Sequence, residues 1–350
     1  MPSRKAGVNW NTPCLSSVSA HRVPGGNALK KDPTILTALH ELVQGNTAGD
    51  PCSALKWKRK SLRELSAQLQ PNYSVSPPTV ARLLTAQDYS LKVNRKTLAV
   101  SSPHRDDQVQ YLEAQKQAFF GRGWPVISVD TKKRELIGLF KNPGTAWCRD
   151  PHRVNIYDFL SLAQGIAIPY GIYDLRFNEG FVSVGTSADT SEFALESILW
   201  WWQTYGRVRY PQAPELLILA DGGGSNGYRP HLWKYALQHR FVDVAGLSVT
   251  VCHYPKGASK WNPVEHRLFG PISCNWAGQP LVSYEVMLNY LNATSTAQGL
   301  VVHARLTDKQ FQKKIKISDK QMEELHLHKH ETFPQWNYTI RPSLNRVQIT

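Results

Sequence analysis

The stretch LLILADGGGSNGYR, residues 216–229, places an aspartate where an aliphatic run ends, and three glycines follow it at once. Such a run is typical of a strand buried on both faces. In sheets whose strands alternate with helices, ligands bind at the carboxyl ends of the strands. Gly222 to Gly224 have no side chains, so backbone and substrate are able to approach the Asp221 carboxylate closely. The stretch therefore predicts a functional carboxylate at the edge of an α/β sheet.

Asp130 is a second acid at the end of a strand-like run. The segment WPVISVDTKKRELIGLFKN, residues 124–142, has two apolar runs joined by a polar turn, which predicts a β-hairpin whose first strand ends at Asp130. Farther along, strand-like runs alternate with helical patterns as far as NPVEHRLFGPIS, residues 262–273. This order predicts an α/β fold, in which helices cover both faces of a mixed sheet.

A third acid, Glu265, lies in the first turn of the helix predicted to follow the last of these strands, after the basic loop PKGASKWN (255–262). Carboxylates on three separate elements repel one another unless cations lie between them. Two Mg²⁺ ions, which Mn²⁺ is able to replace, would meet that need. The order and placement of Asp130, Asp221 and Glu265 match an RNase H-like nucleotidyl-transferase with these residues as metal ligands and catalytic acids.

Each acid also has a simpler structural explanation. Asp130 would cap the hairpin, Asp221 would cap the next helix, and Glu265 would interact with the positive end of its own helix dipole. Neighbouring residues are candidates for supporting roles. Asn226 and Asn262 are expected to orient waters or the carboxylates, and His253 is expected near the metal site or DNA. Four lysines near the acids are candidates for phosphate binding or ordinary surface residues: Lys132, Lys133, Lys256 and Lys260.

The net charge of +14 at pH 7 indicates a polyanionic partner, with double-stranded DNA as the leading candidate and solubility as the alternative explanation. The basic residues cluster in four runs: LKWKRKSLR (55–63), LKVNRKTL (91–98), DTKKREL (130–136) and QKKIKI (312–317). The five cysteines form no C-x-x-C pair, which argues against a zinc site and a disulfide framework. The sequence shows neither a secretory signal nor an apolar run long enough for a membrane span, which predicts a cytoplasmic protein.

Residues 1–30 have no apolar period and are expected to form a disordered arm. Residues 31–103 predict a small all-α region that resembles a helix-turn-helix, because Ser61 with Glu64 forms a capping box and Ser76 precedes two prolines. The alternative is an ordinary helical hairpin. In the helix-turn-helix interpretation, Val80, Leu83 and Leu84 face the core and Thr85 faces outward. The residues expected to contact DNA here are Lys56, Lys58, Arg59, Lys60, Thr79 and Arg82.

The chain resembles the DDE transposases of bacterial insertion sequences, specifically the Rhodopirellula-type group, over roughly residues 50–340. The resemblance is carried by five blocks: PVISVDTKKRELIGLFKNPGTAW, AIPYGIYDL, LLILADGGGSNGYR, VCHYPKGASKWNPVEHRLF and WNYTI. It implies an RNase H-like core that cuts DNA at the ends of an element and joins the freed 3′-hydroxyl to target DNA. Asp130, Asp221 and Glu265 would be its metal-binding triad. A homo-oligomer on DNA, associated with the bacterial nucleoid, is expected.

Members of that group usually carry glycine at the position of Asp88, and they tend to have more helical sequence at the N-terminus. The expected layout is the arm, the helical region, a catalytic domain over residues 104–310 and a C-terminal extension over residues 311–350. Two alternatives remain open at this point. One is an RNase H-like nuclease or resolvase that cuts without joining, and the other is a truncated, inactive transposase that only binds DNA.

Overall fold

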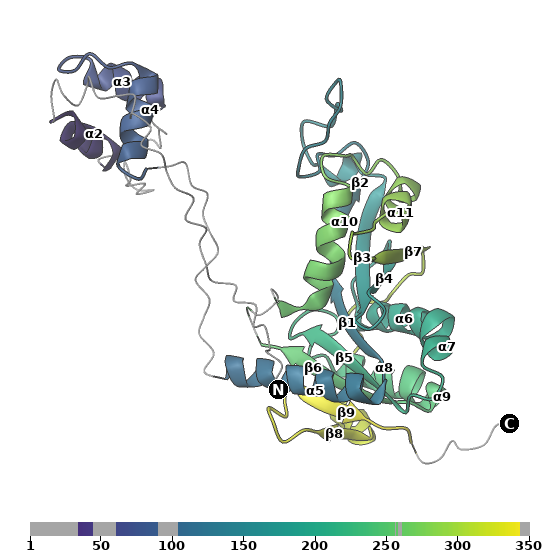
Figure 1. The fold of residues 1–350 in the computed structure, drawn as a ribbon. Helices are drawn as coiled ribbons and strands as arrows, with labels where there is room; N and C mark the ends of the chain where they lie inside the picture. Colours follow the sequence, from purple (N-terminus) through teal and green to yellow (C-terminus); the bar gives the residue numbers. More distant parts are fainter. Residues whose placement is uncertain (1–33, 45–60, 90–103, 256, 258–260, 344–350) are drawn as a thin grey trace, which may run out of the picture. The chain divides into compact units, whose positions relative to one another are not determined.

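The computed structural model describes residues 34–44, 61–89, 104–255, 257 and 261–343 (Figure 1). The chain divides into two compact units, Met1–Thr97 and Leu98–Thr350, and each is described by itself. The domain limits expected from the sequence stay predictions. Several sequence-based expectations lie outside the described residues: the arm of residues 1–30, Lys56, Lys58, Arg59, Lys60, Lys256 and Lys260.

The described residues of the first unit form three helices around one small core. The helices are α2 (Ile35–Gln44), α3 (Leu62–Leu69) and α4 (Pro77–Ala86). Ser61 caps α3, because its hydroxyl accepts a hydrogen bond from the Glu64 N–H at 3.2 Å, which is one of the two bonds of the predicted capping box. Ser76 precedes α4, but its hydroxyl contacts the Thr79 hydroxyl at 3.0 Å instead of a backbone N–H. Arg82 is exposed, as predicted. The core residues include Ile35, Leu39, Leu65, Leu69, Val80 and Leu83.

The end of α4 explains why a glycine is expected at residue 88. Asp88 has φ 61°, a left-handed conformation that glycine adopts most easily. The Tyr89 N–H donates to the Leu84 carbonyl at 2.9 Å, and the Asp88 N–H donates to the Thr85 carbonyl at 3.1 Å. These two bonds form a Schellman motif, which satisfies carbonyl groups at the helix end.

The second unit is organised around one mixed sheet. Its strands are β1 (Val126–Thr131), β2 (Glu135–Ile137), β3 (Gly165–Asp174), β4 (Glu179–Gly185), β5 (Glu215–Asp221), β6 (Ser248–Tyr254), β7 (Val301–Thr307), β8 (Leu327–Lys329) and β9 (Asn337–Ile340). Among the described residues the strand order is β7-β4-β3-β1-β5-β6-β9-β8, with β2 also paired to β3. The β4-β3-β1 part is antiparallel, whereas β5 and β6 run parallel to β1. The predicted RNase H-like mixed sheet is confirmed.

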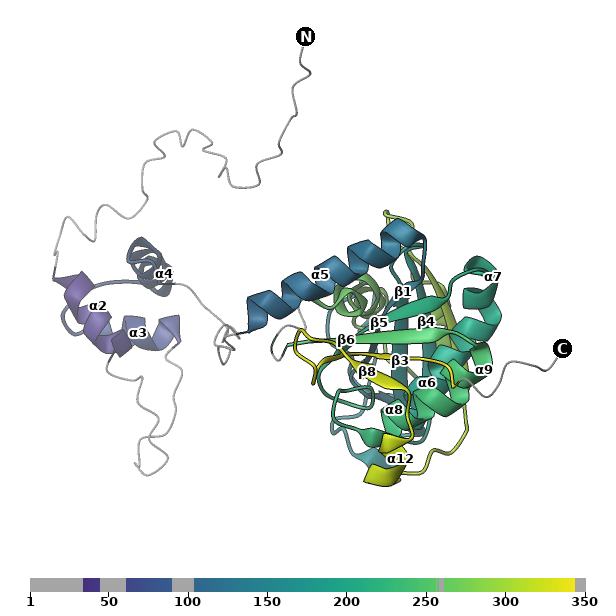
Figure 2. The ribbon, with the colours of Figure 1, turned by 90° about the horizontal axis from the view of Figure 1, so that it is seen from below.

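Helices cover both faces of this sheet, as predicted (Figure 2). On one face, α6 (Ser191–Trp201) and α8 (His231–Leu237) bury large side chains that include Phe193 and Trp233. On the other face, Leu112 and Phe119 of α5 (Arg105–Arg122) pack on β5 and β6. That face is completed by η5 (Val264–Phe269), α10 (Gly270–Asn275) and α11 (Tyr284–Asn292). The shorter helices are η1 (Leu160–Leu162), η2 (Trp202–Gly206), α7 (Arg207–Arg209), η3 (Gln238–Val242), α9 (Asp243–Ala245) and α12 (Asp319–Glu323).

The predicted hairpin over residues 124–142 is wrong. β1 and β2 both pair antiparallel with β3, where Val129 lies opposite Ile172 and Leu136 lies opposite Ile166. The chain therefore continues in one direction along β3 after Asp130 and does not fold back on itself. Polar residues between two apolar runs indicate a break in a strand, but they do not determine its partner, which is distant in sequence.

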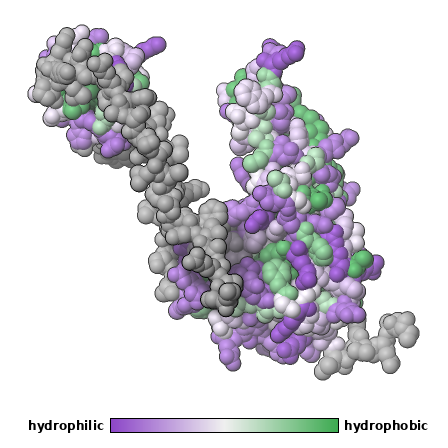
Figure 3. Space-filling model, in the orientation of Figure 1, coloured by the Kyte–Doolittle hydropathy of each residue, from purple (hydrophilic) through white to green (hydrophobic). Residues whose placement is uncertain are grey.

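Residues 327–340, which we expected in a C-terminal extension, supply β8 and β9 at the edge of the same sheet beside β6. The face of the molecule drawn in Figure 3 is mostly hydrophilic, and its hydrophobic residues form separate groups. No helix within the described residues is long and apolar enough to cross a membrane.

Candidate active site

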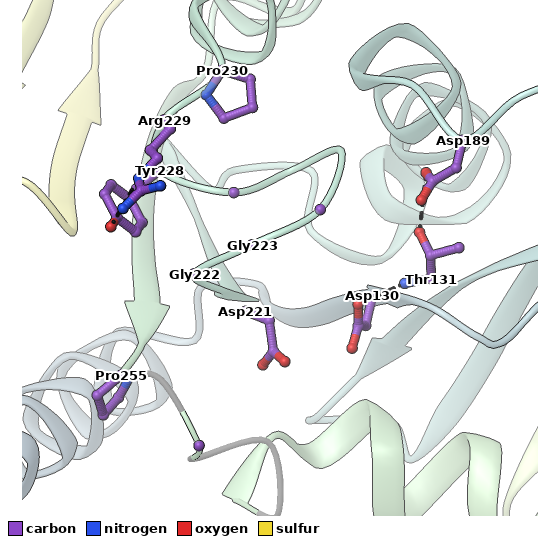
Figure 4. Close-up of a pocket in the computed structure, with 13 residues that line it drawn as sticks. Asp130, Thr131, Asp189, Asp221, Gly222, Gly223, Tyr228, Arg229, Pro230 and Pro255 are labelled. Atoms are coloured by element: carbon purple, nitrogen blue, oxygen red, sulfur yellow. Dashed lines mark hydrogen bonds between the residues drawn. The ribbon is translucent and has the colours of Figure 1, made fainter. Parts of the chain in front are cut away.

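Asp130 and Asp221 lie side by side at the carboxyl ends of two neighbouring parallel strands. Val129 of β1 is in register with Ala220 of β5, so the next residue on each strand is one of the two acids. Side chains alternate along a strand, and Asp221 therefore shares the face of Leu219, which packs against α5. Figure 4 shows the two carboxylates pointing into the same open space. The sequence-based placement of both acids at strand ends is thus observed.

An open pocket of about 630 Å³ lies over these strand ends. Its lining includes Asp130, Asp189, Asp221, the glycine loop, Tyr228 and Arg229 (Figure 4). Gly224 has φ 77°, a left-handed conformation that glycine adopts most easily. A Cβ on Gly227 would lie 2.9 Å from the carbonyl carbon of Gly223, so only glycine fits where the loop folds on itself. The glycines after Asp221 thus form a tight loop in the pocket lining, and they add no side chains that would fill the space.

Glu265 reaches the same region because η5 packs closely on the sheet. Gly171 of β3 lies opposite Asp130, and a Cβ at Gly171 would lie 2.5 Å from the ring of Phe269. The absence of a side chain at this position lets η5 approach the strand that carries Asp130. Glu265 lines a neighbouring pocket of about 320 Å³ together with Lys132 and Lys133.

The three acids affect one another electrostatically. Burial, followed by the charge of Asp221 and that of Glu265, raises the pKa of Asp130 to about 8, even though the Thr131 N–H donates to its carboxylate at 2.7 Å. Burial and the charge of Glu265 also raise the pKa of Asp221, and a hydrogen bond from Asn262 opposes this shift. An arrangement that holds several carboxylates in a partly buried space has a deficit of positive charge, which a divalent cation would correct.

The chemistry of these residues fits a hard divalent cation. Carboxylate oxygens are the preferred ligands of Mg²⁺, and three are available here. Among the described residues, however, no group of three His, Cys, Asp or Glu side chains is close enough together to hold an ion as the side chains stand. Glu265 is within side-chain hydrogen-bonding reach of Asp130, so a change in side-chain conformation on binding would have to complete the ligand set with Asp221.

Asn262 supports Asp221 directly. Its Nδ2 donates to Asp221 Oδ1 at 3.0 Å, and the hydroxyl of Ser128 donates to its Oδ1. The Ser128 oxygen also accepts from the Val264 N–H at 3.2 Å, which ties the start of η5 to β1. Ser128 and Asn262 are both fully buried. The expectation that Asn262 orients a carboxylate agrees with this geometry.

His253 connects the backbone of the glycine loop at Asn226 to that of the segment at Trp336. The His253 ring lies between two backbone carbonyls, with Nε2 at 3.0 Å from the Asn226 oxygen and Nδ1 at 2.8 Å from the Trp336 oxygen. Burial lowers the pKa of His253 to about 4, and a neutral ring has one N–H to donate to these two acceptors. The ring is fully buried and offers no surface to DNA. The side-chain amide of Asn226 is also fully buried, with no hydrogen-bond partner among the described residues.

Lys132 and Lys133 are the members of the predicted phosphate-binding set that lie within the described residues, and they differ in whether their charge is paired. Lys132 forms an ion pair with Glu135 at 2.7 Å and lies over the ring of Trp276 at 4.9 Å. Lys133 is exposed beside Glu265. Lys133 is therefore better placed than Lys132 to meet a phosphate, because the charge of Lys132 is already paired.

Sequence analysis did not identify two residues near Asp130, which are Asp189 and Tyr170. Asp189 lines the active-site pocket, and its carboxylate accepts a hydrogen bond from the Thr131 hydroxyl at 3.2 Å (Figure 4). The hydroxyl of Tyr170 is fully buried without a partner among the described residues, and burial with the charges of Asp130 and Asp189 raises the pKa of Tyr170. Asp189 precedes Thr190 and Ser191, a sequence that indicates only the start of a helix.

The strand order and the helices on both faces define an RNase H-like fold, with two acids at neighbouring strand ends. The chain belongs to the family described as the Rhodopirellula transposase DDE domain, which matches residues 38–342. The resemblance inferred from the sequence blocks is confirmed, and the chain is a transposase.

Comparison with solved structures gives more distant similarities. The chain is similar to the Mos1 transposase paired-end complex with left transposon end, with 13% identity, TM-score 0.43 and coverage of 73% of this chain and 69% of that one. The Mos1 Strand Transfer Complex gives 14% identity and TM-score 0.42, covering 73% and 68%. No curated protein matches the chain.

Proposed function

We propose that this transposase cuts DNA at the ends of an insertion sequence and joins the freed 3′-hydroxyl to target DNA, with Asp130, Asp221 and Glu265 as catalytic metal ligands. The observation that carries the proposal is their convergence. The acids come from β1, β5 and η5, and each of the other two contributes to raising the pKa of Asp130. The capping explanations do not account for this mutual interaction between acids on three separate elements.

Two Mg²⁺ ions, or Mn²⁺ in their place, would supply the charge that stabilises the entering and leaving oxygens of the phosphodiester when bound. The protein's own residues position the reaction. Asn262 fixes the orientation of Asp221 through its hydrogen bond, and Thr131 does the same for Asp130 through its N–H. Lys133, exposed beside Glu265, would bind a phosphate next to the one that is cut.

Double-stranded DNA is the proposed partner, both as element ends and as target. The net charge of +14 would draw the chain to a polyanion and release counterions on binding. In the first unit, the exposed Arg82 on α4 would contact element ends. Because an element has two ends, a homo-oligomer on DNA is proposed, acting in the bacterial cytoplasm at the nucleoid.

The triad is tested by changing its least obvious member. Glu265→Gln keeps the side-chain size but removes the charge, so we expect normal DNA binding and a loss of Mg²⁺-dependent cleavage of at least about a hundredfold, or roughly 2.7 kcal/mol of barrier. Glu285→Gln, at an exposed position in α11, is the matched control and should cut nearly as well as the parent. Glu196 is a poor candidate because it forms ion pairs with Arg240 and Lys309.

The opposite pattern, with an active Glu265 variant and an inactive Glu285 variant, would overturn the assignment. Joined products distinguish the proposed function from a nuclease or resolvase that only cuts. A chain that binds DNA but neither cuts nor joins in Mg²⁺ or Mn²⁺ would instead be an inactive transposase.

A further inference from the structure

A second pocket of about 350 Å³ lies next to the active-site pocket and shares Asp189, Gly224 and Pro230 with it. One wall is the start of α6, and the other is the segment Gln312–Ile315. This segment contains the start of the basic run of residues 312–317, for which the proposed chemistry gives no role.

The basic segment is attached at both ends. The Phe311 N–H donates to the Ser187 hydroxyl at 3.3 Å, and the Phe311 ring packs against Phe193 of α6 with 5.3 Å between ring centroids. Farther along, the Ile317 oxygen contacts His231 Nδ1 at 3.4 Å. Lys313 and Lys314 lie between these attachments. They are exposed, and neither forms an ion pair within the part of the chain that the structure describes.

The opposite wall offers groups that favour an anion. The N-terminus of α6, an 11-residue helix, carries the positive end of the helix dipole. Independently of the helix, the Ser225 hydroxyl in the pocket lining has no hydrogen-bond partner among the described residues, and Ser225 is only 8% exposed. A buried hydroxyl without a partner costs stability, so this donor indicates a ligand that is able to accept from it.

Asp189 carries the opposing charge at the boundary between the pockets. Its carboxylate accepts from the Thr131 hydroxyl and points toward the active site (Figure 4). The Asp189 carboxylate is therefore directed toward the active-site side, where metal ions are proposed, and Glu192 in the first turn of α6 pairs with Arg240 at 3.7 Å. Lys313 and Lys314 line the second pocket and not the active-site pocket, whereas Asp189 is in the lining of both.

We propose that the second pocket binds a phosphate of the DNA backbone, adjacent along the strand to the phosphate that is cut. This proposal rests on the proposed function. Lys313 and Lys314 pair with the phosphate charge, and the Ser225 hydroxyl donates to one of its oxygens. Because the two pockets share a wall, a single strand passes from the carboxylates of the first to the lysines of the second.

The lysines are tested by the salt dependence of binding to a short duplex in buffer without divalent metal. The Lys313→Ala/Lys314→Ala variant should bind more weakly, and the slope of log affinity against log salt should fall by about one for each phosphate that the variant no longer neutralises. Lys316→Ala/Lys320→Ala is the matched control, because it removes the same charge from exposed positions outside the pocket. We expect the control to keep the parent's slope.

The Ser225→Ala variant tests whether the hydroxyl contributes to DNA binding and not to the stability of the fold. The hydroxyl has no protein partner to lose, so the thermal unfolding temperature should not fall, whereas DNA affinity should fall by about threefold to tenfold. Equal affinities and slopes for the two double-lysine variants would overturn the phosphate site. Stabilisation by inorganic phosphate that Ser225→Ala removes, with unchanged DNA binding, would overturn its assignment to DNA.

Cleavage assays on the same variants distinguish the two proposals. If the parent chain does not cut DNA in Mg²⁺ but the two double-lysine variants still differ in binding, the proposed reaction fails and the phosphate site stands. If the parent cuts and the two variants behave alike, the phosphate site fails and the reaction stands.

Discussion

Asn262 donates a hydrogen bond from Nδ2 to Asp221 Oδ1 at 3.0 Å, and the amide has only one orientation that permits this bond. The Ser128 hydroxyl donates to Asn262 Oδ1, so the oxygen faces Ser128 and the nitrogen faces the carboxylate. The hydrogen bond favours the charged form of Asp221 and opposes the effect of burial on its pKa. Asn262 thus helps keep Asp221 in the form that binds a cation.

Asn262→Asp should reduce cleavage without a change in side-chain volume. It replaces the donor with a second carboxylate beside Asp221, so we expect a loss of about tenfold to a hundredfold at a fixed Mg²⁺ concentration, which more Mg²⁺ partly restores. Cleavage rates measured across a Mg²⁺ series check this. Asn289→Asp, at an exposed position in α11, adds the same charge elsewhere and should have no effect. Parent-like rates for Asn262→Asp at low Mg²⁺ would contradict the proposed role.

Asp130→Asn should stabilise the metal-free chain while it removes activity. Burial and two neighbouring acids raise the pKa of Asp130 to about 8, so its charged form is disfavoured in the folded state. At pH 8.5 the amide should increase the free energy of unfolding by about 1 kcal/mol or more, since one pKa unit corresponds to about 1.4 kcal/mol. Thermal unfolding without divalent metal measures the change.

Mg²⁺ provides the second half of that test. It should raise the unfolding temperature of the parent but change that of Asp130→Asn much less, because ligands bind the folded state. A metal-free Asp130→Asn variant less stable than the parent would contradict the interpretation of Asp130 as a strained metal ligand.

Local sequence patterns were sufficient for Asp221. An aliphatic run of strand length that ends in an acid and glycines specifies both the strand end and the tight loop, and the structure has both. Local patterns were not sufficient for the hairpin predicted over residues 124–142. The polar residues after Asp130 are compatible with a turn, but pairing with β3 is determined by contacts distant in sequence. Local patterns contain little information about such a partner.

Asp189 and Glu265 show that local patterns also contain little information about which residues meet at the active site. Glu265 was placed correctly at a helix start, but its proximity to Asp130 depends on Gly171 in a distant strand, which lets η5 approach. Asp189 resembles an ordinary residue before a helix, and only the folding of α6 over the sheet brings it to Thr131. The basic run of residues 312–317 likewise acquired a neighbouring pocket only in three dimensions.

His253 should make the stability of the chain depend on pH in the acid range. Burial lowers its folded-state pKa to about 4, whereas an unfolded histidine titrates near about 6.5. Between these values the unfolded chain binds a proton that the folded chain does not, so stability rises with pH. This contribution is complete above about pH 6.5 and is lost as pH falls toward 4, by up to about 3 kcal/mol.

Urea unfolding of the metal-free protein at several pH values measures this effect. His253→Gln, which keeps a donor for one of the two carbonyls, should lower the slope of stability against pH between about 4 and 6.5 by up to one proton. His328→Gln, at an exposed position of β8, is the control and should leave the slope unchanged. Identical slopes for the parent and His253→Gln would show that the ring does not resist protonation in the folded state.

Asp88→Gly should stabilise the end of α4. Asp88 has φ 61°, and its backbone N–H and that of Tyr89 close the helix by donating to Thr85 and Leu84. Glycine adopts this conformation without a steric cost from Cβ, and the gain should exceed the entropy that glycine adds to the unfolded chain. We expect about 0.5 to 1 kcal/mol, or up to about fivefold slower amide hydrogen exchange at the end of α4 in the full chain. Asp88→Ala retains Cβ and should exchange faster than the parent, since alanine tolerates the left-handed region less well than aspartate. Faster exchange in the glycine variant, or equal rates for the glycine and alanine variants, would show that the backbone conformation at residue 88 does not limit the stability of this helix.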